Sequence, residues 1–221
     1  SEFDGKRVEA AEKIRDFGGS GLYPCDMVVA CNIADLSRTD PFPTPFVTLS
    51  FDLETSVQHN TILCAAVVIA RGESRTEHEF RGSEKEILEG MTRLVRDEDP
   101  DFITGYNIDN FDLPRVIERA EENAGKSKFE QAALCGWGRV PAIESESKRL
   151  SPDRATNRVW RLTGRIPMDA WWQVRQTLRP ERESLRFVAN MLWPEAEDKQ
   201  KLDIDASKMD EEWAARPDEV M

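Results

Sequence analysis

Residues 46–55 read FVTLSFDLET, an apolar run that ends in two carboxylates. Its β-branched and aromatic residues favour a strand, which we predict over residues 46–53. Asp52 and Glu54 are two positions apart, so they project from the same sheet face, while Phe51 and Leu53 point to the opposite face and into the core. Two carboxylates on one face suit a shared metal ion. They are equally typical of the solvent face of an amphipathic strand end, because this spacing is common.

The segments after this strand predict an alternating α/β order. Further strands are expected over residues 61–70, 76–80 and 101–106, the first two forming a meander with residues 46–53. Ser83 followed by Glu86 has the spacing of a capping box, which predicts a helix. Its apolar face comprises Ile87, Leu88, Met91, Leu94 and Val95. A second helix is expected from about Leu113 to Asn123. Three strands, a helix, a strand and a helix indicate an α/β fold.

A second acidic segment, GYNIDNFDLP at residues 105–114, leaves a strand and enters a helix. Asp112 stands where a helix N-cap is expected, and taken alone this position favours capping of the first-turn amides. The positive end of the helix dipole also favours a carboxylate there. Local pattern therefore leaves Asp112 open between a structural and a chemical role.

Taken together, the ordered segments resemble the exonuclease motifs of archaeal-type family B DNA polymerases. The resemblance rests on the DxET strand end, on YNxxxFDLP about 55 residues later, on GRIPMD at residues 164–169, and on the segment beginning Glu183-Ser184-Leu185. It implies a ribonuclease H-like fold, with a mixed sheet flanked by helices. It covers roughly residues 46–221, a 3′-to-5′ exonuclease domain, while residues 1–45 resemble the tail of the preceding N-terminal domain with its linker.

The resemblance also implies the chemistry of the site. Asp52 would bridge two Mg²⁺ or Mn²⁺ ions, Glu54 would bind the first, and Asp112 would hold the second, for two-metal hydrolysis of the 3′-terminal phosphodiester. The residues implied to contact the 3′-terminal DNA are Leu53, Thr55, Asn107 and Phe111. For Phe111, ordinary core packing is an equal alternative.

The resemblance breaks at the family's third motif, Tyr-x-x-x-Asp, which occurs nowhere in the sequence. We therefore expect that the chain stops before this motif and that it has weak or no nuclease activity by itself. Asp169 is the nearest substitute in sequence context, but its position at a helix entry favours capping.

The composition constrains partners and compartment. The formal net charge of −12 runs against nucleic-acid binding, which usually shows a basic footprint; cation binding by acids, or DNA held by other domains, would remove this objection. Only two histidines and four scattered cysteines make a zinc site unexpected. The longest apolar run, residues 62–70, is too short to cross a bilayer. We expect a cytoplasmic protein associated with a prokaryotic chromosome.

The resemblance implies as partners a single-stranded 3′ end or primer-template DNA, the remaining polymerase domains in cis, and a sliding clamp. Two alternatives stay open. One is a freestanding DnaQ-like nuclease. The other is a catalytically inactive ribonuclease H-like module that positions DNA or partner proteins.

In the N-terminal part, helical spacing predicts a helix over residues 6–17, and residues 27–33 resemble a strand.

Overall fold

The computed structural model describes residues 43–139, 143–151, 155–162, 164–194 and 204–220, together with short stretches between residues 6 and 40. The chain divides into two compact units, Ser1–Pro45 and Phe46–Met221. In the first unit, β1 (Lys6–Val8) pairs antiparallel with β2 (Val28–Ala30), and a 3₁₀ turn, η2, covers Ile33–Asp35. The helix predicted from residue 6 is therefore wrong at residues 6–8; its remainder lies outside the described residues.

The second unit is built on a five-stranded mixed sheet of order β5-β4-β3-β6-β9. Its strands are β3 (Val47–Thr55), β4 (Ile62–Arg71), β5 (Ser74–Arg81), β6 (Phe102–Gly105) and β9 (Ile166–Asp169). The first three form the predicted antiparallel meander, whereas β6 pairs parallel with β3, and β9 pairs parallel with β6. The predicted α/β fold with a mixed, helix-flanked sheet is confirmed.

Buried and exposed side chains alternate along β3, so one face of the strand packs in the core and the other carries Asp52. Leu49, Phe51 and Leu53 are at most 3% exposed, whereas Asp52 between them is exposed. The edge of the Phe51 ring packs on Trp137, with ring centroids 5.2 Å apart. Because neighbouring side chains of a strand alternate between faces, the buried residues fix the direction in which Asp52 projects.

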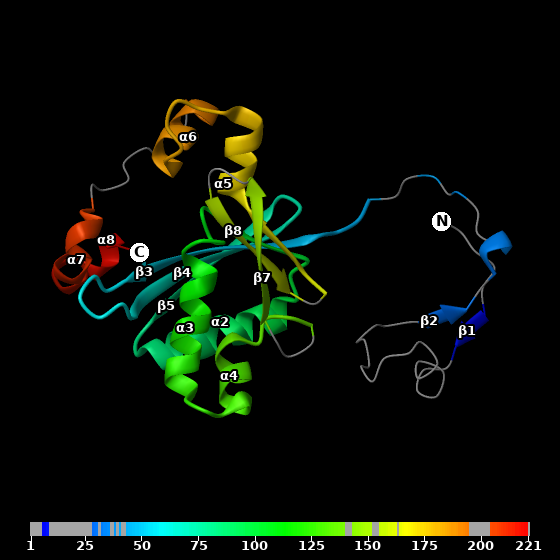
Figure 1. Cartoon of the computed structure of the whole chain (residues 1–221), viewed down its shortest axis with the longest axis horizontal. Helices are drawn as coiled ribbons and strands as arrows, with labels where there is room; N and C mark the ends of the chain where they lie inside the picture. The colour runs from blue at the N-terminus through cyan, green and yellow to red at the C-terminus, as the bar shows by residue number, and fades with distance from the viewer. Residues whose placement is uncertain are drawn as a thin grey trace. The chain divides into compact units, whose positions relative to one another are not determined.

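Helices α2 (Glu84–Glu98) and α3 (Asp112–Ala124) lie on the core face of the sheet, and α4 (Lys128–Cys135) packs against these two helices (Figure 1). The predicted capping box is present, with Ser83 and Glu86 bonding each other's backbone N–H. Four of the five residues predicted for its apolar face are buried, and the fifth, Leu94, packs at the edge of the core. Helix α4 was not predicted.

A buried arginine ties the helix layer to the strand that carries the third family-like segment. Arg165 is 7% exposed, and its guanidinium donates to the carbonyl oxygens of Trp137 (2.6 Å), Pro100 (2.6 Å) and Val95 (3.3 Å) and to the Asp99 carboxylate (2.8 Å). The rigid, planar guanidinium of arginine presents several N–H donors and so suits several acceptors at once. Arg165 thereby fixes the start of β9 against the end of α2.

The remaining elements lie before and after β9 in the chain. A hairpin of β7 (Ile143–Ser151) and β8 (Ala155–Leu162) precedes β9. Then come α5 (Ala170–Gln173), the π-helical turn η3 (Val174–Leu178), α6 (Leu185–Leu192), the 3₁₀ turn η4 (Ala206–Lys208), α7 (Met209–Ala215) and α8 (Pro217–Val220). Among the described residues, no helix has the length and apolar character of a membrane span.

Candidate active site

A long-range hydrogen bond joins the two acidic segments. Oδ1 of Asp112 accepts from the backbone N–H of Leu53 at 3.2 Å, across 59 positions of sequence. Asp112 is the first residue of α3, the N-cap is Phe111, and no side chain caps this helix. The capping role that local pattern favoured for Asp112 is therefore wrong, because its side chain turns to β3 instead.

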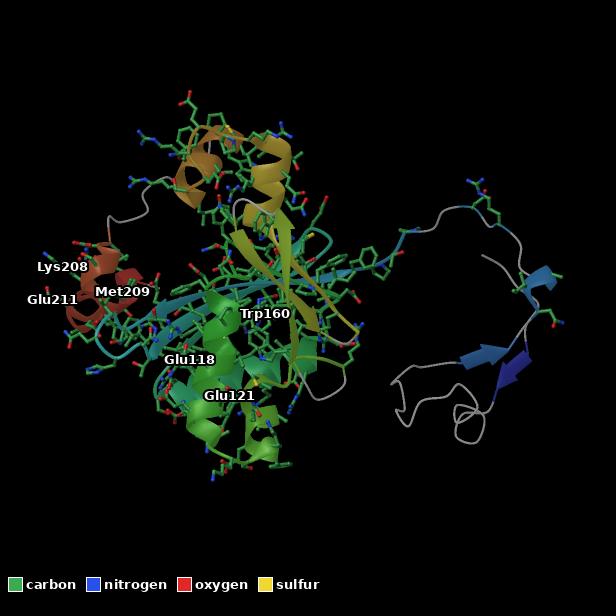
Figure 2. The ribbon with its side chains drawn as sticks, viewed as in Figure 1. Glu118, Glu121, Trp160, Lys208, Met209 and Glu211 are labelled. Atoms are coloured by element: carbon green, nitrogen blue, oxygen red, sulfur yellow. The ribbon has the colours of Figure 1, made fainter. Side chains whose placement is uncertain are left out.

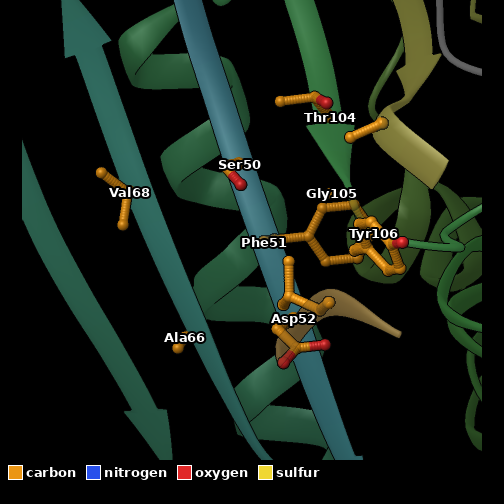
Figure 3. A pocket seen from close by; sticks show the side chains of 10 residues that line it. Ser50, Phe51, Asp52, Ala66, Val68, Thr104, Gly105 and Tyr106 are labelled. Atoms are coloured by element: carbon orange, nitrogen blue, oxygen red, sulfur yellow. The ribbon is translucent and has the colours of Figure 1, made fainter. Parts of the chain in front are cut away.

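The side chain of Asp52 lines a pocket of about 480 Å³ on the sheet face opposite α2. Figure 3 shows Ser50 and Asp52 on β3, Ala66 and Val68 on the neighbouring β4, and the Tyr106 ring beyond the end of β6. The remaining lining residues are Phe51, Thr104, Gly105, Ala170 and Leu185. The pocket is thus mostly apolar, and its polar lining residues include Ser50, Thr104 and Asp52.

Burial and repulsion perturb the acids of this region. The pKa of Asp112 rises to about 7, chiefly because the side chain is buried and secondly because of the negative charge of Asp52. The Leu53 N–H acts in the opposite direction but does not cancel the rise. The negative charge of Asp52 thus favours the neutral form of the Asp112 carboxyl. A cation bound between Asp52 and Asp112 would stabilise the charged form of Asp112 and so lower its pKa.

Glu54 lies two residues beyond Asp52 along β3 and is half-buried. It pairs across the sheet with Cys64, and the register shifts between Glu54 and Thr55. The charge of Glu54 helps to raise the pKa of the Cys64 thiol to about 12, although burial of the thiol contributes most. Glu54 therefore lies at the strand end, toward the β3–β4 turn.

The loop that carries Asn107 is organised by Asp169. Its two carboxylate oxygens accept from the backbone N–H groups of Asn107 (2.8 Å) and Asp109 (3.1 Å), and Asp169 also caps α5 by accepting from Trp171 N–H (2.9 Å). The expected capping role is thus present, together with a loop-holding role that the sequence did not indicate. On the other side, Nε1 of Trp160 donates to the Asp109 carbonyl oxygen (2.9 Å).

Asn107 has a left-handed backbone, with φ 68°, a conformation that asparagine tolerates better than most residues. Its side-chain oxygen accepts from the amide of Asn110 at 2.9 Å. Phe111 is 40% exposed, with the Arg115 guanidinium 5.8 Å from the ring centroid. The core-packing alternative for Phe111 is therefore not what the structure has.

The candidate ligand atoms are carboxylate oxygens, which are the type that hard divalent cations prefer. Mg²⁺ and Mn²⁺ prefer oxygen ligands, and the candidate side chains offer carboxylates alone. Within the described ranges, however, no group of three or more His, Cys, Asp or Glu side chains is arranged to hold a metal ion. Metal ligation by Asp52, Glu54 and Asp112 therefore stays a prediction, as do DNA contacts of Leu53, Thr55, Asn107 and Phe111.

Comparison with known proteins decides the family. Residues 70–188 match the family model described as DNA polymerase family B, exonuclease domain. The chain belongs to this family. The bovine (Bos taurus) DNA polymerase delta catalytic subunit is 29% identical over 160 residues, which is 69% of the chain and 12% of that protein. DNA polymerase 1 of Pyrococcus abyssi is 28% identical over 121 residues, or 55% of the chain and 14% of that protein.

A solved structure supports the fold of this exonuclease-family chain. The family B DNA polymerase of Pyrobaculum calidifontis superposes with a TM-score of 0.65 at 18% sequence identity, covering 98% of the chain and 25% of the polymerase. The predicted membership of the family B polymerases and the ribonuclease H-like fold are confirmed. The chain spans about an eighth of the length of the curated relatives quoted above.

Proposed function

We propose that the chain provides the 3′-to-5′ exonuclease activity of a family B DNA polymerase. It would hydrolyse the last phosphodiester bond of a single-stranded or frayed 3′ end and release a nucleoside 5′-monophosphate. The observation that carries the proposal is the bond from Leu53 N–H to Asp112, because it holds the two acidic segments together. Family membership supports the same assignment.

The roles of the chain's own residues follow from their positions. Asp52 and Asp112 would hold Mg²⁺ or Mn²⁺, with Glu54 as a further ligand at the strand end. Bound ions would supply two-metal chemistry, lowering the pKa of the attacking water and stabilising the leaving oxygen. Asp112 is buried, and the negative charge of Asp52 repels a second charge there. A bound cation therefore favours deprotonation of Asp112, and its absence disfavours it.

The pocket beside Asp52 has the size of a small-ligand site, since such sites run from about 300 to 1,000 Å³. Ala66 and Val68 offer it apolar contacts, and the aromatic ring of Tyr106 offers a stacking surface. We propose that it receives the terminal nucleotide. The exposed ring of Phe111 and the Asn107 loop would contact the DNA strand next to its terminal nucleotide. Leu53 would contact the DNA by groups other than its N–H, which bonds Asp112.

Polymerisation, primer-template DNA, the other polymerase domains in cis and a sliding clamp belong to the proposal for the whole protein. They are inferred from the family alone. The chain spans a small part of its relatives, so these properties concern the rest of the protein.

The direct test is nucleotide release from single-stranded DNA labelled at the 3′ or the 5′ end, by the chain and by its natural full-length protein. We expect the full-length protein to release labelled mononucleotide at once from the 3′ label only, dependent on Mg²⁺ or Mn²⁺ and stopped by a chelator. The chain by itself, which has no Tyr-x-x-x-Asp segment, should release little or none. Tight, metal-independent binding of 3′ ends with no release by either protein would support the inactive-module alternative instead.

A further inference from the structure

Asp210, on the first turn of α7, bonds a turn that lies far from it in sequence. Its Oδ2 accepts from the backbone N–H of Val57 at 2.8 Å and of Gln58 at 3.3 Å. A hydrogen bond with the Ser56 side chain is the main reason why the pKa of Asp210 lies below its ordinary value. One carboxylate therefore engages three consecutive residues of the β3–β4 turn.

The turn is otherwise held from within. Ser56 is 3% exposed, its backbone N–H donates to Thr61 (2.8 Å), and its side-chain oxygen accepts from His59 N–H (2.9 Å). Asn60, with φ 61°, donates to the Ser56 carbonyl at 3.0 Å. These bonds do not involve the N–H groups of Val57 and Gln58, for which Asp210 is the acceptor. Asp210 therefore completes the hydrogen bonding of the turn.

An apolar contact holds α7 in place for this role. Met209, beside Asp210, is 3% exposed and forms a buried cluster with Cys64 of β4 and Val220 of α8. Partly buried residues pack around it: Leu63, Ile204 and Trp213. Arg81 of β5 adds an ion pair with Asp218 of α8. Figure 1 shows α7 and α8 at the hairpin end of β3 and β4.

The turn begins directly after the strand end that carries Glu54 and Thr55. Cys64, in the cluster with Met209, is the cross-strand partner of Glu54, and the register shift of the hairpin falls between Glu54 and Thr55. A register shift leaves the local ladder irregular. The direction of the Glu54 side chain is therefore set partly by what holds the turn.

We propose that Asp210 is a positioning residue for the nuclease site: by bonding the β3–β4 turn, it fixes the end of β3 and thereby the direction of Glu54. This inference rests on the proposed function, since it assigns Glu54 to cation binding. In this role Asp210 acts through the turn and not by contact with DNA or the ions.

The test uses the natural full-length protein with the substitutions Asp210→Ala, Asp210→Asn and Asp210→Glu. The matched control is Glu211→Ala, which removes a carboxylate from the exposed side of the same helix turn (Figure 2). The readouts are the Mg²⁺ concentration at half-maximal nucleotide release, the unfolding temperature, and amide hydrogen exchange of residues 52–58.

We expect Asp210→Ala to raise the half-maximal Mg²⁺ concentration roughly 10-fold or more, as loss of a group that orients a metal ligand does. Exchange over residues 52–58 should accelerate, Asp210→Glu should restore most of both properties, Asp210→Asn should fall between, and Glu211→Ala should match the wild type. An altered Mg²⁺ requirement is the readout that general destabilisation would not produce.

Two results would overturn the inference: an unchanged Mg²⁺ requirement in Asp210→Ala, or unchanged exchange over residues 52–55 in that variant. If the wild-type protein releases no nucleotides under any metal, the proposed function fails. The exchange measurement then still decides whether Asp210 orders the end of β3.

Discussion

The carboxylate of Asp112 accepts a hydrogen bond from the backbone N–H of Leu53, the residue that separates Asp52 from Glu54. The bond ties the first turn of α3 to the end of β3, so the position of each acidic segment depends on the other. Asp112 is 2% exposed, and a buried acceptor of this kind is costly to leave without a donor.

Substitutions at Asp112 should separate its structural role from its chemical role. Asp112→Asn keeps an oxygen that can accept from Leu53 and removes the buried charge, so we expect stability equal to or above that of the wild type in the absence of metal. Asp112→Ala loses the acceptor and should lower the free energy of unfolding by about 1–3 kcal/mol. Both should abolish nucleotide release. Denaturant unfolding measures the difference in stability between the two variants. Equal stability would contradict the structural role of the Asp112 acceptor.

The raised pKa of Asp112 predicts a pH dependence with a definite sign. Between the ordinary value of 3.8 and about 7, the folded chain keeps a proton that the unfolded chain has lost. The unfolded state then binds fewer protons, so stability falls as the pH rises through this range. Thermal unfolding of the metal-free protein should show this fall.

Asp112→Asn provides the comparison for that pH series. The fall should be smaller in this variant, though not absent, because burial and the charge of Asp169 also raise the pKa of Asp109 to about 7. Adding Mg²⁺ near pH 7 should release protons from the wild-type protein and raise its unfolding temperature. Identical pH profiles for the wild type and the variant would contradict the role assigned to Asp112.

Arg165 should contribute strongly to stability although it lies outside the nuclease chemistry. Replacing it with methionine keeps a similar length but removes the guanidinium donor of three carbonyl oxygens and one of the two arginine partners of the Asp99 carboxylate. We expect a loss of about 1–3 kcal/mol in the free energy of unfolding, because buried carbonyl oxygens lose their donor.

Arg71→Ala is the matched control for Arg165→Met. Arg71 pairs with Glu98 at 2.6 Å, but its side chain is 48% exposed, and exposed pairs contribute about 1 kcal/mol or less. Comparable losses in the two variants would show that the Arg165 network does not hold β9 to α2.

Local sequence pattern predicted the elements that local physics governs. The alternation of Leu49, Phe51 and Leu53 with polar neighbours set the faces of β3, and the Ser83 and Glu86 pair set the start of α2. Helix α4 carried a readable signal that the sequence analysis missed. Ser127 is its N-cap and accepts from Glu130 N–H, three residues on.

Other features depend on partners that no local window contains. Asp112 has the context of a cap, yet it bonds Leu53; Asp210 has the context of a solvated helix face, yet it bonds the turn after Thr55. Residues 6–8 have helical spacing, yet they pair with Val28–Ala30 as a strand. In each case a contact between distant segments outweighs local preference, as tertiary context commonly does.

The most direct measurement for the whole account is the substitution Asp52→Ala in the natural full-length protein, assayed in parallel for nucleotide release and for primer extension. We expect release from single-stranded 3′ ends to fall by more than about 100-fold, beyond the loss typical for groups that only orient a metal ligand. Primer extension should continue at the wild-type rate, and Glu77→Gln, an exposed change on β5, should leave both activities intact. Unchanged release, or equal loss of both activities, would contradict the assignment of Asp52 to a nuclease site.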